Sequence, residues 1–299
     1  MMHGKRVWMT RLGWVLVIAL AIILGPWEFA EAQEASVDSE QNSAVDGSAE
    51  VGELDTNRFM SKLTPDEPLY FAIGWNELIN AKFQFSFKFA FMNPQGALTR
   101  KAPFFSHVYF GYTQTSLWDL EGESKPFFDT SFKPSLFYRH NNVHRSESGD
   151  FRIWGQVGYQ HESNGQGGEE SRSLDIIYVK PVFEFAQIWG GGHLTVVPRL
   201  WIYPGTPDEN PDIAEYRGYG DLRMAFTGQS DWQVAATIQV GTSGKGSVQL
   251  DGTWPMDKIL GRNFDAYLYA QYFNGWGESL RSYDQRLPWQ LRLGIAVVR

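Results

Sequence analysis

In residues 81–91, AKFQFSFKFAF, every second residue from position 83 is a phenylalanine. The residues that alternate with the rings, from position 82 on, are two lysines, a glutamine, a serine and an alanine. Successive side chains of a β-strand point to opposite faces, so this pattern predicts a strand with one aromatic and one polar face. A water-soluble barrel or sandwich would bury the rings in its core, whereas a membrane barrel would turn them toward lipid and the polar groups toward a wet lumen. The stretch alone is compatible with both.

The N-terminus predicts export. Lys5, Arg6 and Arg11 precede the apolar run GWVLVIALAIILG, which is short for a bilayer-spanning helix. Ala30-Glu31-Ala32 follows as a signal peptidase site. We therefore expect residues 1–32 to be a signal peptide, and the alternative is an uncleaved anchor helix.

Composition narrows the function classes and divides the remaining chain. The chain has no cysteine, which excludes disulfide scaffolds and cysteine catalysis. Its net charge of −8, with no basic stripe, argues against nucleic acid as a partner. Residues 33–65 are acidic and poor in large apolar groups, so we expect a flexible periplasmic segment. Residues 66–299 suit a single barrel.

Short alternating runs separated by breakers such as NPQG, ESGD and PDENP continue through residues 66–299. The faces opposite the apolar ones hold too many charged and amide side chains for a dry core. Together with export and the aromatic density, this favours an antiparallel barrel in the outer membrane with the Phe row facing acyl chains. The expected strands lie near 67–75, 81–92, 104–115, 131–140, 151–163, 171–185, 193–203, 216–226, 232–241, 246–254, 264–273 and 289–298.

Residues 159–175, YQHESNGQGGEESRSLD, contain a candidate catalytic constellation. On the strand 151–163, His161 and Ser163 share the apolar, lipid-directed face, close enough for a hydrogen bond between imidazole and hydroxyl. Asp175 has the same parity on the next strand, and an antiparallel pair would bring it opposite His161. Polar residues near barrel rims are often merely solvated, but three polar side chains on a lipid-facing apolar surface cost free energy. They supply a nucleophile, a base and an orienting acid.

The segment HESNG followed by SRSLD resembles the HxSNG…SRSxN signature of the outer-membrane phospholipase A family. The similarity covers most of residues 67–298. By that resemblance the fold is all-β, a 12-stranded antiparallel transmembrane barrel. The implied activity is calcium-dependent hydrolysis of phospholipid acyl esters at either glycerol position, and of lysophospholipids. Further segments that resemble the family, in the same order, are YTQTSLW at 112–118, ESKPFFDTSFKP at 123–134, ENPDIAEYRGY at 209–219 and GWGESLRSYD at 275–284.

The resemblance also implies catalytic roles. Ser163 matches the nucleophile and His161 the general base, and Asp175 stands where the family usually has asparagine. An aspartate would still orient His161 and would stabilise its imidazolium form. A backbone N–H near Gly165, with a water held by calcium, would stabilise the oxyanion.

Calcium and dimerisation are likewise implied by the family. The matching calcium positions are the Ser171 hydroxyl, the Gln166 carbonyl and Ser124 of a second protomer, with Glu209 at a further calcium position. Gln114 matches a membrane-embedded glutamine of the interface in the active homodimer; from the sequence it could equally face the lumen or the rim.

Two other functions remain open at this level. A non-enzymatic barrel of the same ancestry, a channel or a scaffold, would have a charged, unplugged lumen. A soluble secreted β-protein would be extracted without detergent. With a periplasmic N-terminus, the strand 151–163 runs outward and carries His161 and Ser163 toward the external rim. The last strand ends in Arg299, where such barrels commonly end in an aromatic residue.

Overall fold

The structure, a computed structural model, describes residues 59–76, 78–205, 208–261 and 264–299. The expected signal peptide, 1–32, lies outside these residues, as does the expected acidic segment up to residue 58. The last part of that segment is described, and Leu63–Thr64 form the short strand β1, which pairs with β3.

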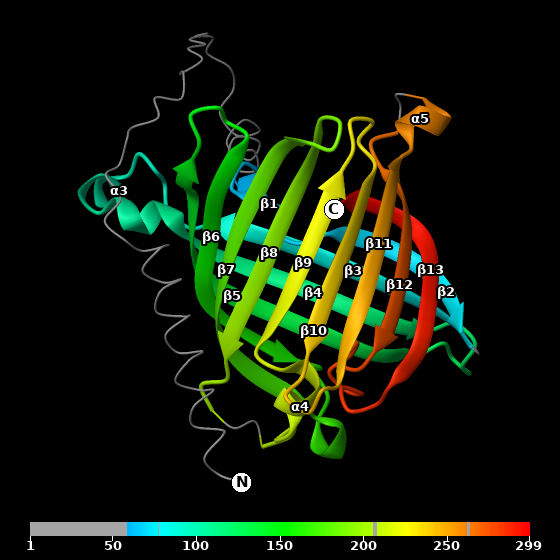
Figure 1. Ribbon diagram of the computed structural model, residues 1–299. Helices are drawn as coiled ribbons and strands as arrows, with labels where there is room; N and C mark the ends of the chain where they lie inside the picture. Colours follow the sequence, from blue (N-terminus) through cyan, green and yellow to red (C-terminus); the bar gives the residue numbers. More distant parts are fainter. Residues whose placement is uncertain (1–58, 77, 206–207, 262–263) are drawn as a thin grey trace, which may run out of the picture.

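Twelve long strands, β2 to β13, form a closed antiparallel barrel (Figure 1). Strands that follow one another in the chain pair with each other, and β13 pairs with β2 to close the wall. The sequence-based expectation of a 12-stranded antiparallel barrel is therefore confirmed. The strands are β2 (Leu69–Asn76), β3 (Leu78–Ala90), β4 (Val108–Asp119), β5 (Phe127–Arg145), β6 (Phe151–Ser163), β7 (Ser173–Ile188), β8 (Gly192–Ile202), β9 (Gly220–Thr227), β10 (Gln233–Val240), β11 (Gly246–Pro255), β12 (Tyr267–Gly275) and β13 (Leu287–Val298).

Short helices occupy the connections: α3 (Ala97–Lys101), η1 (Pro103–His107), η2 (Gly168–Glu170), α4 (Ile213–Arg217) and α5 (Asp257–Leu260). No helix in the described part of the chain is both long and apolar enough to cross a membrane.

Two strand starts were predicted four residues too early, the largest errors of this kind. The strand expected at 104–115 begins at Val108, because Pro103 starts η1, where its missing N–H is no loss. The strand expected at 216–226 begins at Gly220, because α4 occupies the preceding residues. Strand β5 runs well beyond the expected 131–140 on both sides.

The Phe face of β3 points outward. Phe85 is 49% exposed, whereas Lys82 and Ser86 on the opposite face are 5% and 1% exposed. Exposed apolar side chains continue around the wall, for example Leu136 on β5 and Leu293 on β13. The barrel is thus apolar outside and polar inside, which excludes the water-soluble alternative with rings in the core.

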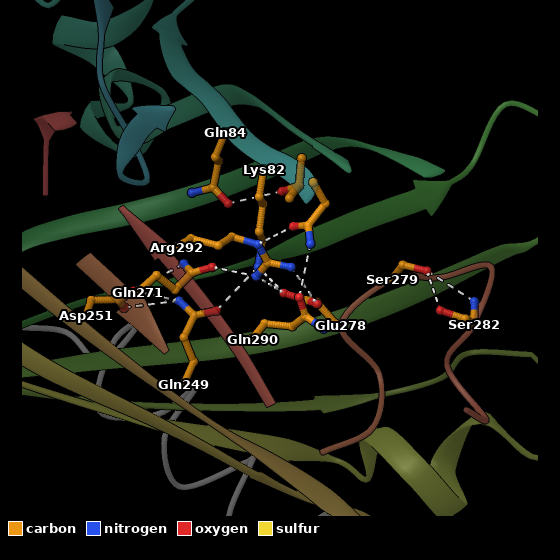
Figure 2. A network of polar contacts seen from close by, with 12 residues as sticks. Lys82, Gln84, Gln249, Asp251, Gln271, Glu278, Ser279, Ser282, Gln290 and Arg292 are labelled. Carbon is orange, nitrogen blue, oxygen red and sulfur yellow. Dashed lines mark hydrogen bonds and ion pairs between the residues drawn. The ribbon is translucent and has the colours of Figure 1, made fainter. Parts of the chain in front are cut away.

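A network of polar side chains lies inside the barrel (Figure 2). Glu278, in the connection between β12 and β13, lies between Lys82 and Arg292, at Nζ–Oε1 3.1 Å and Nη1–Oε1 2.6 Å. Arg292 also donates to Gln271, which donates to Asp251. A cavity of about 500 Å³ remains in the lumen, and Lys82, Glu278 and Asp251 are among the residues that line it.

The Glu278 ion pairs make stability depend on pH. Burial alone would raise the pKa of Glu278, but the charges of Lys82 and Arg292 outweigh it and lower the pKa to about 2. A lowered pKa contributes stability that is fully present above the unfolded value of 4.5 and is lost as pH falls toward 2. We expect Glu278→Gln to lower the free energy of unfolding by about 3 kcal/mol at pH 7, and this difference to shrink below pH 4.5.

Denaturant unfolding of both proteins between pH 7 and pH 3 measures this difference. Because other carboxylates titrate equally in the two proteins, only the gap between their unfolding midpoints is informative. A gap that stays constant over the whole range would contradict the assignment to Glu278.

Candidate active site on the outer wall

The candidate site begins with the register of β6 and β7. His161 lies directly opposite Asp175, and Ser163 directly opposite Ser173. Directly opposed residues of an antiparallel pair share a face. The expected juxtaposition of positions 161 and 175 is confirmed, and both face outward with the exposed Ile177 and Tyr159.

His161 and Asp175 are joined by a hydrogen bond of 2.9 Å between Nδ1 and Oδ1. A carboxylate only accepts, so this contact selects the tautomer with Nδ1–H and leaves Nε2 unprotonated. Tyr159 Oη donates to the same carboxylate oxygen at 2.5 Å. Tyr159 was not predicted from the sequence, although its position two residues before His161 places it on the same face. The pair is only half-covered, since the side chains of His161 and Asp175 are 38% and 45% exposed.

Ser163 stands on the same outward face but apart from the ring of His161. Residues two apart on a strand have Cα atoms about 7 Å apart, so contact requires both side chains to turn toward each other. Asp175 holds the ring instead, and among the described residues no hydrogen bond joins Ser163 to His161. The hydrogen bond expected from the sequence is therefore absent. Such contacts often close only when substrate is bound.

Asn164 shapes the turn that follows Ser163. It is 2% exposed, its Nδ2 donates to the Glu170 carbonyl at 2.8 Å, and its Oδ1 accepts from the Arg172 N–H at 3.0 Å. Gly165 has a φ of 68°, and a Cβ there would lie 2.8 Å from the Phe132 ring. The turn therefore requires glycine at 165. Asn164 had no role predicted from the sequence, although asparagine commonly stabilises turns in this way.

Two of the expected calcium positions lie together. Glu209 accepts hydrogen bonds from Ser171 Oγ at 2.8 Å and from Ser173 Oγ at 2.6 Å. These bonds from Ser173 and Ser171 favour the carboxylate and lower the pKa of Glu209. Ser173 was missed from the sequence because its role depends on a loop 36 residues away.

The other two expected positions lie in turns. Gln166 is exposed in the turn after β6, and its N–H donates to Asn164. Ser124 is exposed in the turn between β4 and β5, with a φ of 64°. No cluster of three His, Asp or Glu side chains suited to a metal occurs in the described ranges. Hydroxyl, carbonyl and single carboxylate oxygens are nevertheless the hard donors that calcium prefers.

Gln114 lies on the outer wall, which decides between the two orientations left open by the sequence. It is directly opposite Phe85 on one side and Phe132 on the other, and Phe132 is opposite Ser163. These residues form one outward row across four strands. With strands about 4.8 Å apart, Gln114 is about 10 Å from Ser163. Its amide bonds Tyr112 and Ser116 on its own strand.

The inner side of the site strands is firmly packed. Glu162, between His161 and Ser163, points inward and is buried in an ion pair with Arg217 of α4 at 3.1 Å. Lys133 lies 3.8 Å from the same carboxylate. An apolar cluster lies beneath β7; it contains Phe137, Leu174, Ile176, Tyr178, Trp201, Ile213, Leu280 and Tyr283. The outward residues of β6 and β7 thus rest on a packed inner layer.

The sequence profile of the phospholipase A1 family matches residues 57–298. The chain belongs to this family. A putative phospholipase A1 of Neisseria meningitidis serogroup B is 33% identical over 201 residues, which are 64% of this chain and 48% of that protein. The chain therefore spans about half the length of this relative.

Solved structures of the family have the same fold. The outer membrane phospholipase A of Escherichia coli superposes with a TM-score of 0.64 at 25% identity, covering 79% of this chain and 98% of that one. The outer membrane phospholipase of Salmonella typhi, a dimer with bound calcium, gives 0.63 at 25% identity over 79% and 92% of the two chains. The chain described here, as a member of the same family, is accordingly a barrel of the bacterial outer membrane.

Proposed function

We propose that this chain hydrolyses the acyl esters of membrane phospholipids, with Ser163 as nucleophile. The observation that carries the proposal is the bonded pair His161–Asp175 on the lipid-facing wall, with Ser163 on the same face of β6. Membership of the phospholipase A1 family supports the substrate class. A nucleophile on this wall meets acyl esters where the bilayer presents them.

The arrangement performs acyl transfer by a general-base mechanism. His161 Nε2 takes the proton of Ser163 Oγ as the oxygen attacks the ester carbonyl carbon. Asp175 accepts the Nδ1–H bond and stabilises the imidazolium that forms. The ring then protonates the leaving glycerol oxygen, and a water deprotonated by the same ring releases the fatty acid. The backbone N–H near Gly165 would donate to the developing oxyanion.

Calcium fits the donor set beside Ser163. Ser171 and the Gln166 carbonyl of this chain, with Ser124 of a second copy, would hold the ion, and Glu209 adds a carboxylate next to Ser171. When bound, the ion supplies positive charge near the ester and fixes a water.

Dimerisation would complete the site. A second barrel laid along the row from Gln114 to Ser163 would wall off the exposed site and bring its own Ser124 close. Gln114 would then have a polar partner in an apolar interface. The calcium-bound dimer from Salmonella typhi supports this arrangement by analogy.

The open position of the site supports broad specificity. His161 and Asp175 lie on a wall, not in an enclosed pocket, so either glycerol position and lysophospholipids would reach Ser163.

The proposal includes export through a signal peptide at 1–32 and a periplasmic segment at 33–65 that ends in β1. A channel function is less favoured, because the Glu278 network and the apolar cluster fill much of the lumen.

The test is fatty-acid release from phospholipid in mixed micelles, with calcium or with a chelator. We expect calcium to raise the rate by on the order of 10²-fold, because it stabilises the charge of the transition state. Sedimentation in the same detergent should show the dimer with calcium and the monomer without it. Equal release with chelator would contradict the calcium part of the proposal, and no release from a folded barrel would favour the scaffold alternative.

A further inference from the structure

Residues 276–286 connect β12 to β13 at the barrel end where β6, β8 and α4 also end (Figure 1). We call this connection the strap. It contains most of the segment 275–284, which resembles the family. None of the proposed catalytic or calcium-binding residues lies in that segment. Its side chains reach both loops that carry the proposed calcium ligands.

The strap is anchored inside the barrel. Glu278 is held by Lys82 and Arg292 in the lumen network, and Ser279 and Ser282 close a small turn through their hydroxyls at 2.9 Å (Figure 2). Leu280 is fully buried in the apolar cluster beneath β7. A buried, doubly paired carboxylate and a buried leucine give the strap a fixed position.

From this anchor, Arg281 reaches the turn after β6. Its N–H donates to Asp129 at 2.9 Å and its Nη1 to the Phe128 carbonyl at 3.0 Å, both on β5. Its Nη2 forms an ion pair with Glu170. Glu170 directly precedes Ser171, and its carbonyl is the group that Asn164 binds. Arg281 therefore joins the turn to β5.

Tyr283 reaches the other loop. Its hydroxyl donates to Asp212, the residue that precedes α4 and follows Glu209 by three positions. Its ring packs edge-on against Tyr216 of α4, with centroids 5.5 Å apart. Tyr283 also belongs to the cluster with Leu174, the neighbour of Asp175 on β7. The strap thus contacts the site turn through Arg281 and the Glu209 loop through Tyr283, two residues further along the chain.

We propose that the strap sets the calcium affinity of the proposed site, with Arg281 and Tyr283 as positioning residues. This inference rests on the proposed function. Ser171 and Glu209 belong to separate loops. When an ion binds both, ordering the loops costs conformational entropy and weakens binding, unless the loops are already ordered. The strap orders them beforehand. Loss of its contacts weakens binding but leaves the chemistry of the fully loaded site intact.

Direct calcium titration by calorimetry of the full-length barrel in detergent tests the proposal. We expect Arg281→Gln and Tyr283→Phe each to raise the half-saturating calcium concentration about threefold, and the double variant about tenfold. Release at saturating calcium should stay within about twofold of wild type, since these residues do not touch the reacting atoms. Arg281→Lys should recover part of the loss, because it keeps the charge toward Glu170.

Arg286→Gln is the matched control. Arg286 lies in the same strap, but its side chain donates to Asn274 and lies over the Trp276 ring. We expect its calcium affinity to equal that of wild type. The unfolding midpoint of Tyr283→Phe is compared with that of wild type. Equal midpoints would show that a loss of calcium affinity comes from positioning and not from a loss of folding.

The outcomes distinguish the two proposals. If wild type requires calcium and the double variant binds it equally well, the role of the strap is refuted and the proposed function stands. Reduced release at saturating calcium with unchanged affinity would refute the strap in the same way. If wild type neither binds nor requires calcium, the calcium part of the proposed function fails and this inference fails with it.

Discussion

We expect Ser163→Ala to lower fatty-acid release by about 10⁴-fold or more, because the substitution removes the proposed attacking oxygen. The barrel itself should be unaffected, since Ser163 is only half-buried and the substitution removes one hydroxyl. The measurement is the initial rate in mixed micelles at saturating calcium. A covalent acyl-enzyme detected by mass spectrometry in wild type and missing in the variant would assign the attacking atom.

Ser247→Ala is the control for this experiment. Ser247 lies on β11 and pairs with Gly275 of β12, far along the sheet from β6. Its replacement should leave the rate unchanged. Release that survives Ser163→Ala at more than about a tenth of the wild-type rate would put the nucleophile elsewhere and refute the assignment.

Asp175→Ala has the second largest expected effect, a loss of about 10²- to 10³-fold in the rate. Without the carboxylate, the ring of His161 loses its only orienting partner among the described residues, and neither the tautomer nor the direction of Nε2 is selected. The circular dichroism and the heat-modified gel mobility of the barrel should remain those of wild type, because Asp175 is half-exposed.

Asp175→Asn should retain the rate within about tenfold, although the same change is severe in other catalytic triads. An asparagine at position 175 can turn either its amide oxygen or its amide N–H₂ toward His161. Only the oxygen can accept the hydrogen bond from Nδ1–H. Tyr159 contributes here, because its hydroxyl donates to the same oxygen that His161 contacts and so favours oxygen at that position.

The variant Asp175→Asn with Tyr159→Phe isolates that contribution. We expect the rate of the double variant to fall by more than the two single losses combined, each expressed as a free energy. The reason is that the amide then has no neighbour that selects its orientation. Strictly additive effects would show that Tyr159 does not orient residue 175.

The outward and inward faces of the barrel could be predicted from the sequence. Phe85 points out and Lys82 points in, as the alternation requires, because the direction of a strand side chain is a local property of the pleated backbone. The pairing of His161 with Asp175 was predictable for a similar reason. The single connection 164–172 joins the two strands, so its length and the parity of the residues nearly determine the register.

Strand ends were less predictable where short helices replace extended chain. Pro103 starts η1 and delays β4, and α4 delays β9. A single helical turn has too few residues for a helical period to appear in the sequence.

Contacts between loops were decided by the tertiary structure alone. Glu209 meets Ser171 and Ser173, and Arg281 meets Glu170, because closure of the barrel brings the ends of β6, β8 and β12 to one rim. Nothing in the local pattern around Arg281 or Tyr283 distinguishes them from solvated loop residues. The two faces of the strands and the parity of the catalytic candidates were predictable from the sequence, because both follow from a two-residue period. Which loop side chains hold the site together depends on distances across the closed barrel, and a local period carries no information about them.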